Sequence, residues 1–121
     1  MSKLQGKNFE IKIETDDNVC LVELSGYLTH GLFEEMVPLV EERLAAGFRE
    51  FVFDLADVSM LESPAVACIL TLTEKIVDDF QGHLVYSGLS DMHVKILEMV
   101  GVFLYANFCK DKQEAILECK A

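Results

Sequence analysis

The sequence predicts an α/β fold with a mixed, mostly parallel five-stranded sheet and about four helices, in the order ββαβαβαβα. Two observations lead to this prediction. The chain opens with two stretches of strand periodicity joined by a polar turn, which is typical of an antiparallel hairpin. Segments of helical periodicity then alternate with short apolar runs, which is the pattern of strand–helix–strand crossovers in a parallel sheet.

The first two strands are predicted within residues 9–26. Ile11 and Ile13 alternate with charged residues, as in a half-buried strand. Residues 16–18, Asp-Asp-Asn, have the chemistry of a turn. A second strand follows from Val19 to Leu24, and Gly26 is expected to end it.

The first helix is predicted within residues 30–48, where apolar residues recur at helical spacing between glutamates. Gly47 is a plausible residue to follow its last turn. Pro38 deletes one backbone hydrogen bond, so it should either kink this helix or mark its true start.

A buried strand at residues 50–55 precedes the second helix. Ser63 followed by Pro64 forms a good pair for the N-cap and the first helical position, and the helix should run to about Phe80. The remaining elements continue the alternation as strand 83–88, helix 90–101, strand 103–108 and helix 110–120. No linker or repeat divides the chain, so residues 1–121 are predicted to form one domain with a core at about residues 9–118.

The composition places the protein in the globular class, since 51% of its 121 residues are hydrophobic and 26% are charged. No apolar run approaches the roughly 20 residues that span a bilayer, and the polar N-terminus lacks an apolar signal core. We therefore expect a cytoplasmic protein without membrane insertion. The net charge of −11 disfavours nucleic acid and anionic membranes as partners, and favours a protein partner with a basic face. Solubility alone would also explain this charge.

Catalytic and metal-binding motifs are absent from the sequence. The seven glycines form no phosphate-binding loop, and no serine lies in a G-x-S-x-G motif. The four cysteines have no C-x-x-C spacing, and the three histidines do not cluster with them along the chain. The sequence therefore predicts no enzyme activity, no cofactor, no metal site and no disulfide framework.

Residues 63–73, with the sequence SPAVACILTLT, carry one serine ahead of an uncharged helix. Ser63 is interpreted as an N-cap, and a phosphate placed there would be stabilised by the unpaired N–H groups and the dipole of the helix. The run itself predicts either deep burial or an exposed apolar docking surface, and both can hold on opposite faces.

The segment DVSMLESPAVACIL resembles the switch region of STAS domains, and within them of the bacterial anti-sigma factor antagonists. These proteins carry Asp-Ser-Ser-Gly ahead of an apolar helix, and here the matching residues are Glu62, Ser63, Pro64 and Ala65. The segment GYLT resembles the Gly-x-Leu-Asp of the family, with Thr29 in place of the aspartate, and MVGVF and KQEAIL resemble downstream elements. The resemblance covers about residues 9–117.

The resemblance implies a binding module that is not itself an enzyme. A partner anti-sigma factor with kinase activity would phosphorylate Ser63, and a phosphatase would reset the cycle. The residues that the resemblance implies for partner binding are Gly26, Thr29, His30, Glu62, Ser63, Pro64, Ala65 and Val66.

Two further hypotheses stay open. The chain could be a STAS scaffold without a phosphorylation switch, as a subunit of a stress-signalling complex or of a lipid or anion transporter. It could also be a small enzyme with an unrecognised site, which a deep polar pocket with converging histidine and carboxylate groups would indicate. The uncharged helix would equally allow two copies of the chain to pair as a homodimer.

Overall fold

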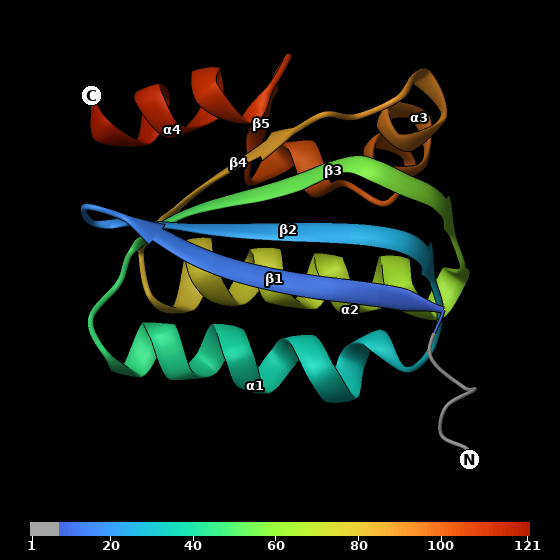
Figure 1. Ribbon diagram of the computed structural model, residues 1–121, viewed down its shortest axis with the longest axis horizontal. Helices are drawn as coiled ribbons and strands as arrows, with labels where there is room; N and C mark the ends of the chain where they lie inside the picture. Colours follow the sequence, from blue (N-terminus) through green and yellow to red (C-terminus); the bar gives the residue numbers. More distant parts are fainter. Residues whose placement is uncertain (1–7) are drawn as a thin grey trace.

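The computed structural model describes residues 8–121 (Figure 1). It confirms the predicted α/β class and element order. The predicted domain limits and the polar N-terminal segment include residues 1–7, which lie outside the described residues. The elements are β1 (Phe9–Asp16), β2 (Val19–Leu28), α1 (Leu32–Ala45), β3 (Glu50–Leu61), α2 (Ser63–Glu74), β4 (His83–Ser87), α3 (Asp91–Met99), β5 (Asn107–Cys109) and α4 (Lys112–Lys120), with a π-helical turn, η2 (Lys75–Asp79), and a 3₁₀ turn, η3 (Val102–Leu104).

The sheet has the strand order β1-β2-β3-β4-β5, with β1 antiparallel to β2 and the other neighbours parallel. Helices α1 and α2 lie on one face and α4 lies on the other (Figure 1). Alternation along the strands produces these two layers, because successive side chains point to opposite faces. On β3, for example, Phe51 and Phe53 belong to the larger core under α1 and α2, whereas Val52 belongs to the smaller core under α4.

The prediction that Gly26 ends the second strand is wrong. Strand β2 continues to Leu28, and its pairing with β3 shifts register on either side of Gly26. Gly26 has a φ of +88°, a conformation open to glycine, so the irregularity bends the strand without ending it. Strand β3 also runs beyond the predicted residue 55, as far as Leu61.

Pro38 lies inside α1 and does not mark its start, because the helix begins at Leu32 and continues to Ala45. Pro38 itself is exposed. The buried stripe of Leu32, Met36, Val40 and Leu44 packs into the core along the whole length of the helix. This packing outweighs the backbone hydrogen bond that proline deletes.

The predicted strand at residues 103–108 is also displaced. Residues 102–104 form the 3₁₀ turn η3, and the strand itself is only Asn107–Cys109. Phe103 does not enter the sheet but packs edge-on against Tyr86, with ring centroids 6.3 Å apart. The aromatic residues of this segment favour a strand, but here the contact of Phe103 with the core outweighs that propensity.

Candidate functional site

The N-terminus of α2 differs from the prediction in one detail. Glu62 occupies the N-cap position, and Ser63 is the first residue of the helix, so the interpretation of Ser63 as N-cap is wrong. Glu62 has extended backbone angles and its carbonyl accepts from the Val66 N–H at 3.0 Å, which defines the first helical turn. No side chain caps this terminus, so the exposed Ser63 hydroxyl is not engaged in capping.

The ends of β2 and β3 bring two predicted segments together. Leu28 pairs with Leu61, and the Glu62 N–H donates to the Leu28 carbonyl at 2.9 Å. As a result Thr29 and His30 lie beside Glu62, and the three residues line a shared hollow of about 330 Å³. Thr29 and Glu62 are far apart in the sequence, but β2 and β3 are parallel neighbours, so the residues that follow these strands lie at the same edge of the sheet.

A second hollow, on the other side of Ser63, is an apolar groove between α2 and α3. Its volume is about 370 Å³, and Ser63 is on its wall together with Leu61, Val66, Ala67, Leu70, Ile96, Met99 and Val100. Met99 is 85% exposed, so a large apolar side chain stands at the rim. We call this feature the α2–α3 groove. Sequence reasoning missed the contribution of α3, although the apolar pair Met99-Val100 at the end of this helix was a usable signal.

The uncharged run has a buried face and an exposed face. Ala65, Val66, Cys68, Ile69, Leu72 and Thr73 are buried against the sheet and the neighbouring helix. Ala67 and Thr71 are exposed on the opposite face, and Leu70 is half-buried at the groove. Because the exposed face lacks charge, it adds apolar surface beside Ser63.

The other predicted site residues have different surroundings. Pro64 is exposed next to Ser63, whereas Ala65 has no exposed surface, so the Ala65 side chain acts here only through packing. Val66 is buried on one side and forms part of the groove wall. Gly26 lines a separate hollow of about 270 Å³ with Phe9, and Phe9 also borders the hollow of Thr29 and His30.

None of the cysteine thiols is poised to act as a nucleophile. Burial raises the pKa of Cys68 to about 11 and is also the main reason that the pKa of Cys119 rises to about 12. The pKa values of Cys20 and Cys109 are raised as well, again chiefly by burial. A catalytic cysteine requires a lowered thiol pKa, so these environments are those of protonated thiols.

The family model for the STAS domain matches residues 10–115 of the chain. The chain belongs to the STAS domain family. The match covers the α2–α3 groove and the N-terminus of α2, so it extends well beyond the switch segment.

Solved structures agree with this STAS assignment at the level of the fold. An anti-sigma factor antagonist from Mycobacterium paratuberculosis has a TM-score of 0.80 at 15% identity, with 93% of this chain and 95% of that chain covered. The phosphorylated form of the Bacillus cell fate determinant SpoIIAA has a TM-score of 0.72 at 16% identity, covering 90% and 98%. A chain in the molecular architecture of the stressosome has a TM-score of 0.68 at 16% identity, covering 90% and 96%.

Within residues 8–121, no helix of this STAS domain is long and apolar enough to cross a membrane.

Proposed function

We propose that this STAS domain is a cytoplasmic regulatory binding module of the anti-sigma factor antagonist type, without enzyme activity of its own. Its partner is an anti-sigma factor with kinase activity, which phosphorylates Ser63, and a phosphatase reverses the modification. The observation that carries the proposal is the position of the exposed Ser63 hydroxyl, at the uncapped start of α2 and on the wall of an apolar groove.

The chemistry of the helix start supports modification at this residue. The first turn of α2 contains no acidic side chain and no side-chain cap, so its N–H groups can receive an anion. A phosphoserine brings a charge of about −2 at pH 7 and three acceptor oxygens. The free N–H groups and the positive end of the helix dipole would stabilise that phosphate without rearrangement of the fold.

The surroundings of Ser63 explain how a phosphate would control binding. The α2–α3 groove offers apolar surface for a partner side chain, and Glu62, Thr29 and His30 offer polar contacts on the other side. A phosphate at the junction would have to lose water when the partner docks, and it would add charge to a protein that already carries −11. The unphosphorylated form would therefore bind, and the phosphorylated form would be released.

The remaining residues of the proposed contact surface have supporting roles. Pro64 fixes the backbone next to the modified residue and is exposed to a partner. Ala65 and Val66 hold the first turn of α2 on the core, and Gly26 shapes the neighbouring strand end.

The test is the intact mass of the protein after incubation with ATP and a candidate anti-sigma kinase from the same organism. We expect one added phosphate on wild type and none on Ser63→Ala. Ser59→Ala is the matched control, because Ser59 is also an exposed serine near the end of β3. A phosphate that persists in Ser63→Ala, or is lost in Ser59→Ala, would contradict the assignment. Ser63→Asp should weaken binding while circular dichroism shows an intact fold.

A second candidate function is a permanent STAS scaffold within a larger assembly, such as a stress-signalling complex or a lipid or anion transporter. The width of the apolar surface favours it, because Met60 and Leu104 are exposed in addition to the groove. The fold likeness to the stressosome chain is compatible with it. A stable complex that is indifferent to Ser63→Ala and Ser63→Asp would support the scaffold, and a stable pair of copies of this chain would identify the homodimer.

A further inference from the structure

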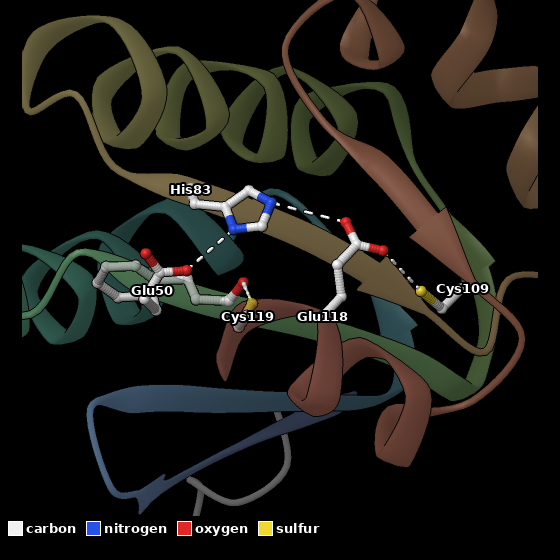
Figure 2. Close-up of polar contacts among 6 residues, drawn as sticks. Glu50, His83, Cys109, Glu118 and Cys119 are labelled. Carbon is white, nitrogen blue, oxygen red and sulfur yellow. Dashed lines mark hydrogen bonds and ion pairs between the residues drawn. The ribbon is translucent and has the colours of Figure 1, made fainter. Parts of the chain in front are cut away.

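On the α4 face, side chains from three separate segments converge at the amino ends of β3 and β4 (Figure 2). Glu50 is the first residue of β3, His83 is the first residue of β4, and the two are register partners. Cys119 comes from the last turn of α4. One ligand atom from each of these residues lies within 4.8 Å of the other two.

The donor atoms have the chemistry of a transition-metal site. A carboxylate oxygen, an imidazole nitrogen and a thiolate sulfur form a mixed set that suits zinc and disfavours magnesium or calcium. In a tetrahedral zinc site with bonds of about 2.0–2.3 Å, ligand atoms lie roughly 3.3–3.8 Å apart. The Glu50 Oε1 atom is 2.9 Å from His83 Nδ1, so the Glu50 carboxylate must move slightly away from the ring for both atoms to bind one ion.

The residues around the cluster orient its ligands. Glu118 places Oε2 3.6 Å from His83 Nε2, on the ring nitrogen that does not face Glu50 (Figure 2). Its other oxygen, Oε1, accepts from the Cys109 thiol at 3.4 Å. A carboxylate behind a histidine is the usual outer partner of a metal-bound imidazole, because it fixes the tautomer and the ring orientation.

We propose that Glu50, His83 through Nδ1, and Cys119 bind one divalent zinc ion, with Glu118 as the positioning residue and solvent as the fourth ligand. The Cys119 thiol loses its proton to solvent when the sulfur–zinc bond forms, and His83 binds as the neutral tautomer whose proton is on Nε2, facing Glu118. The sequence prediction of no metal site rested on spacing along the chain, and the fold brings together residues that this spacing separates.

Access and burial are compatible with reversible loading. The His83 side chain is 43% exposed, so an ion can enter from solvent on that side. Cys119 is only 7% exposed and packs in the smaller core with Val52, Val85 and Ala115, so apolar side chains exclude water from this side of the site. This apolar environment has a low local dielectric constant, which strengthens the attraction between the ion and its charged ligands.

Binding would fasten α4 to the sheet. The core under this helix is small, and its other polar anchors, such as Lys112 to Glu23 and Lys120 to Asp16, are ion pairs near the surface. Glu50 and His83 belong to β3 and β4, whereas Cys119 belongs to α4, so one ion connects all three elements. An ion that binds only this folded arrangement must raise the stability of the protein.

The first experiment titrates the metal-free, tag-free protein with Co²⁺ and with Zn²⁺. We expect one Co²⁺ per chain, with a sulfur-to-cobalt charge-transfer band that one equivalent of Zn²⁺ removes and excess Mg²⁺ does not. Cys119→Ser should abolish the band, whereas Cys109→Ser should retain it. Loss of the band in Cys109→Ser, its persistence in Cys119→Ser, or displacement by Mg²⁺ would overturn the proposal.

The second experiment measures Zn²⁺ affinity by calorimetry and does not depend on Cys119 variants. His83→Gln should weaken binding by at least about tenfold, which is the loss that even removal of an outer partner commonly causes. His30→Gln is the matched control, because His30 is an exposed histidine remote from the cluster, and its affinity should equal that of wild type. Equal affinity of wild type and His83→Gln would overturn the proposal.

A stability measurement distinguishes zinc bound at the proposed site, where it would connect α4 to the sheet, from adventitious binding elsewhere. Zn²⁺ should raise the melting temperature of wild type and slow amide exchange in α4, and neither effect should occur in His83→Gln. The same stabilisation in both proteins would refute a site at His83. These outcomes are independent of Ser63, because no site residue of the proposed switch belongs to the cluster.

Discussion

The hydroxyl groups of Thr73 and Tyr86 lie 2.6 Å apart in the core between α2 and β4. The Thr73 hydroxyl donates to the Ile69 carbonyl at 2.8 Å, so the Tyr86 hydroxyl is the donor of the pair. Burial, which is the largest cause, raises the pKa of Tyr86. Tyr86 therefore donates to Thr73, and the Tyr86 hydroxyl depends on Thr73 as its acceptor.

Because Tyr86 donates and Thr73 accepts, conservative substitutions of the two residues should lower the free energy of unfolding by unequal amounts. Tyr86→Phe should lower the free energy of unfolding by about 1 kcal/mol, because Thr73 keeps its bond to Ile69. Thr73→Val should cost about 2 kcal/mol, because a buried hydroxyl is left without an acceptor. Urea unfolding of both variants and the double variant gives the coupling. Additive losses, or a larger loss for Tyr86→Phe, would contradict the assignment of donor and acceptor.

Gly26 is a structural residue in addition to any contact it makes with a partner. A Cβ at this position would lie 2.5 Å from the Asn8 carbonyl oxygen, and φ is +88°. Gly47 is the matched control, because its φ is also positive, at +101°, but no atom lies within 4 Å of the added Cβ. Gly47→Ala should cost roughly 1–2 kcal/mol from backbone strain. Gly26→Ala should cost a further 1–3 kcal/mol from the clash, measured by urea unfolding. Equal losses would show that Asn8 moves away freely.

His93 should make stability depend on pH. The Ser90 N–H donates to His93 Nδ1 at 3.2 Å, the His93 N–H donates to Ser90 Oγ at 3.1 Å, and Nε2 has no partner among the described residues. Burial lowers the pKa of His93 below 6.5. The unfolded chain therefore binds the proton more readily, and stability falls as pH drops through 6.5 towards the folded pKa.

The measurement for His93 is the free energy of unfolding between pH 7.5 and 5. His93→Gln is the comparison variant, because glutamine preserves a capping box with Ser90 but does not titrate. The difference in stability between wild type and His93→Gln should shrink or reverse as pH falls. A difference that is constant with pH would contradict the prediction.

The α2–α3 groove predicts a substitution that affects binding and not folding. Met99 is 85% exposed at the groove rim, so Met99→Ser should change stability by no more than about 0.5 kcal/mol. It should nevertheless weaken capture of the proposed anti-sigma partner, because a docked partner would bury that side chain. Leu117→Ser is the matched control, since Leu117 is 68% exposed on α4, on the opposite face of the sheet. Equal binding by both variants would exclude this groove as the docking surface.

Elements with strong periodicity were predictable from the sequence, and those that depend on tertiary contacts were not. Alternation around Ile11 and Ile13 indicates β1, and the apolar stripe from Leu32 to Leu44 indicates α1, because burial of one face requires those periods. The continuation of β2 past Gly26, however, depends on the pairing of its last residue, Leu28, with Leu61 of β3. The 3₁₀ turn at Phe103 depends on an edge-on contact with Tyr86, so its residues alone read as a strand.

The sequence by itself determined the alternating α/β topology and the presence of Ser63 at the start of an uncharged helix, because periodicity and local composition carry both. Only the tertiary structure decided that Glu62, and not Ser63, occupies the N-cap, and that α3 completes a groove beside the serine. It also brought His83 to Glu50, 33 positions away, and to Cys119. Parallel strand pairing and the packing of α4 on the sheet create these contacts, so spacing along the chain cannot predict them.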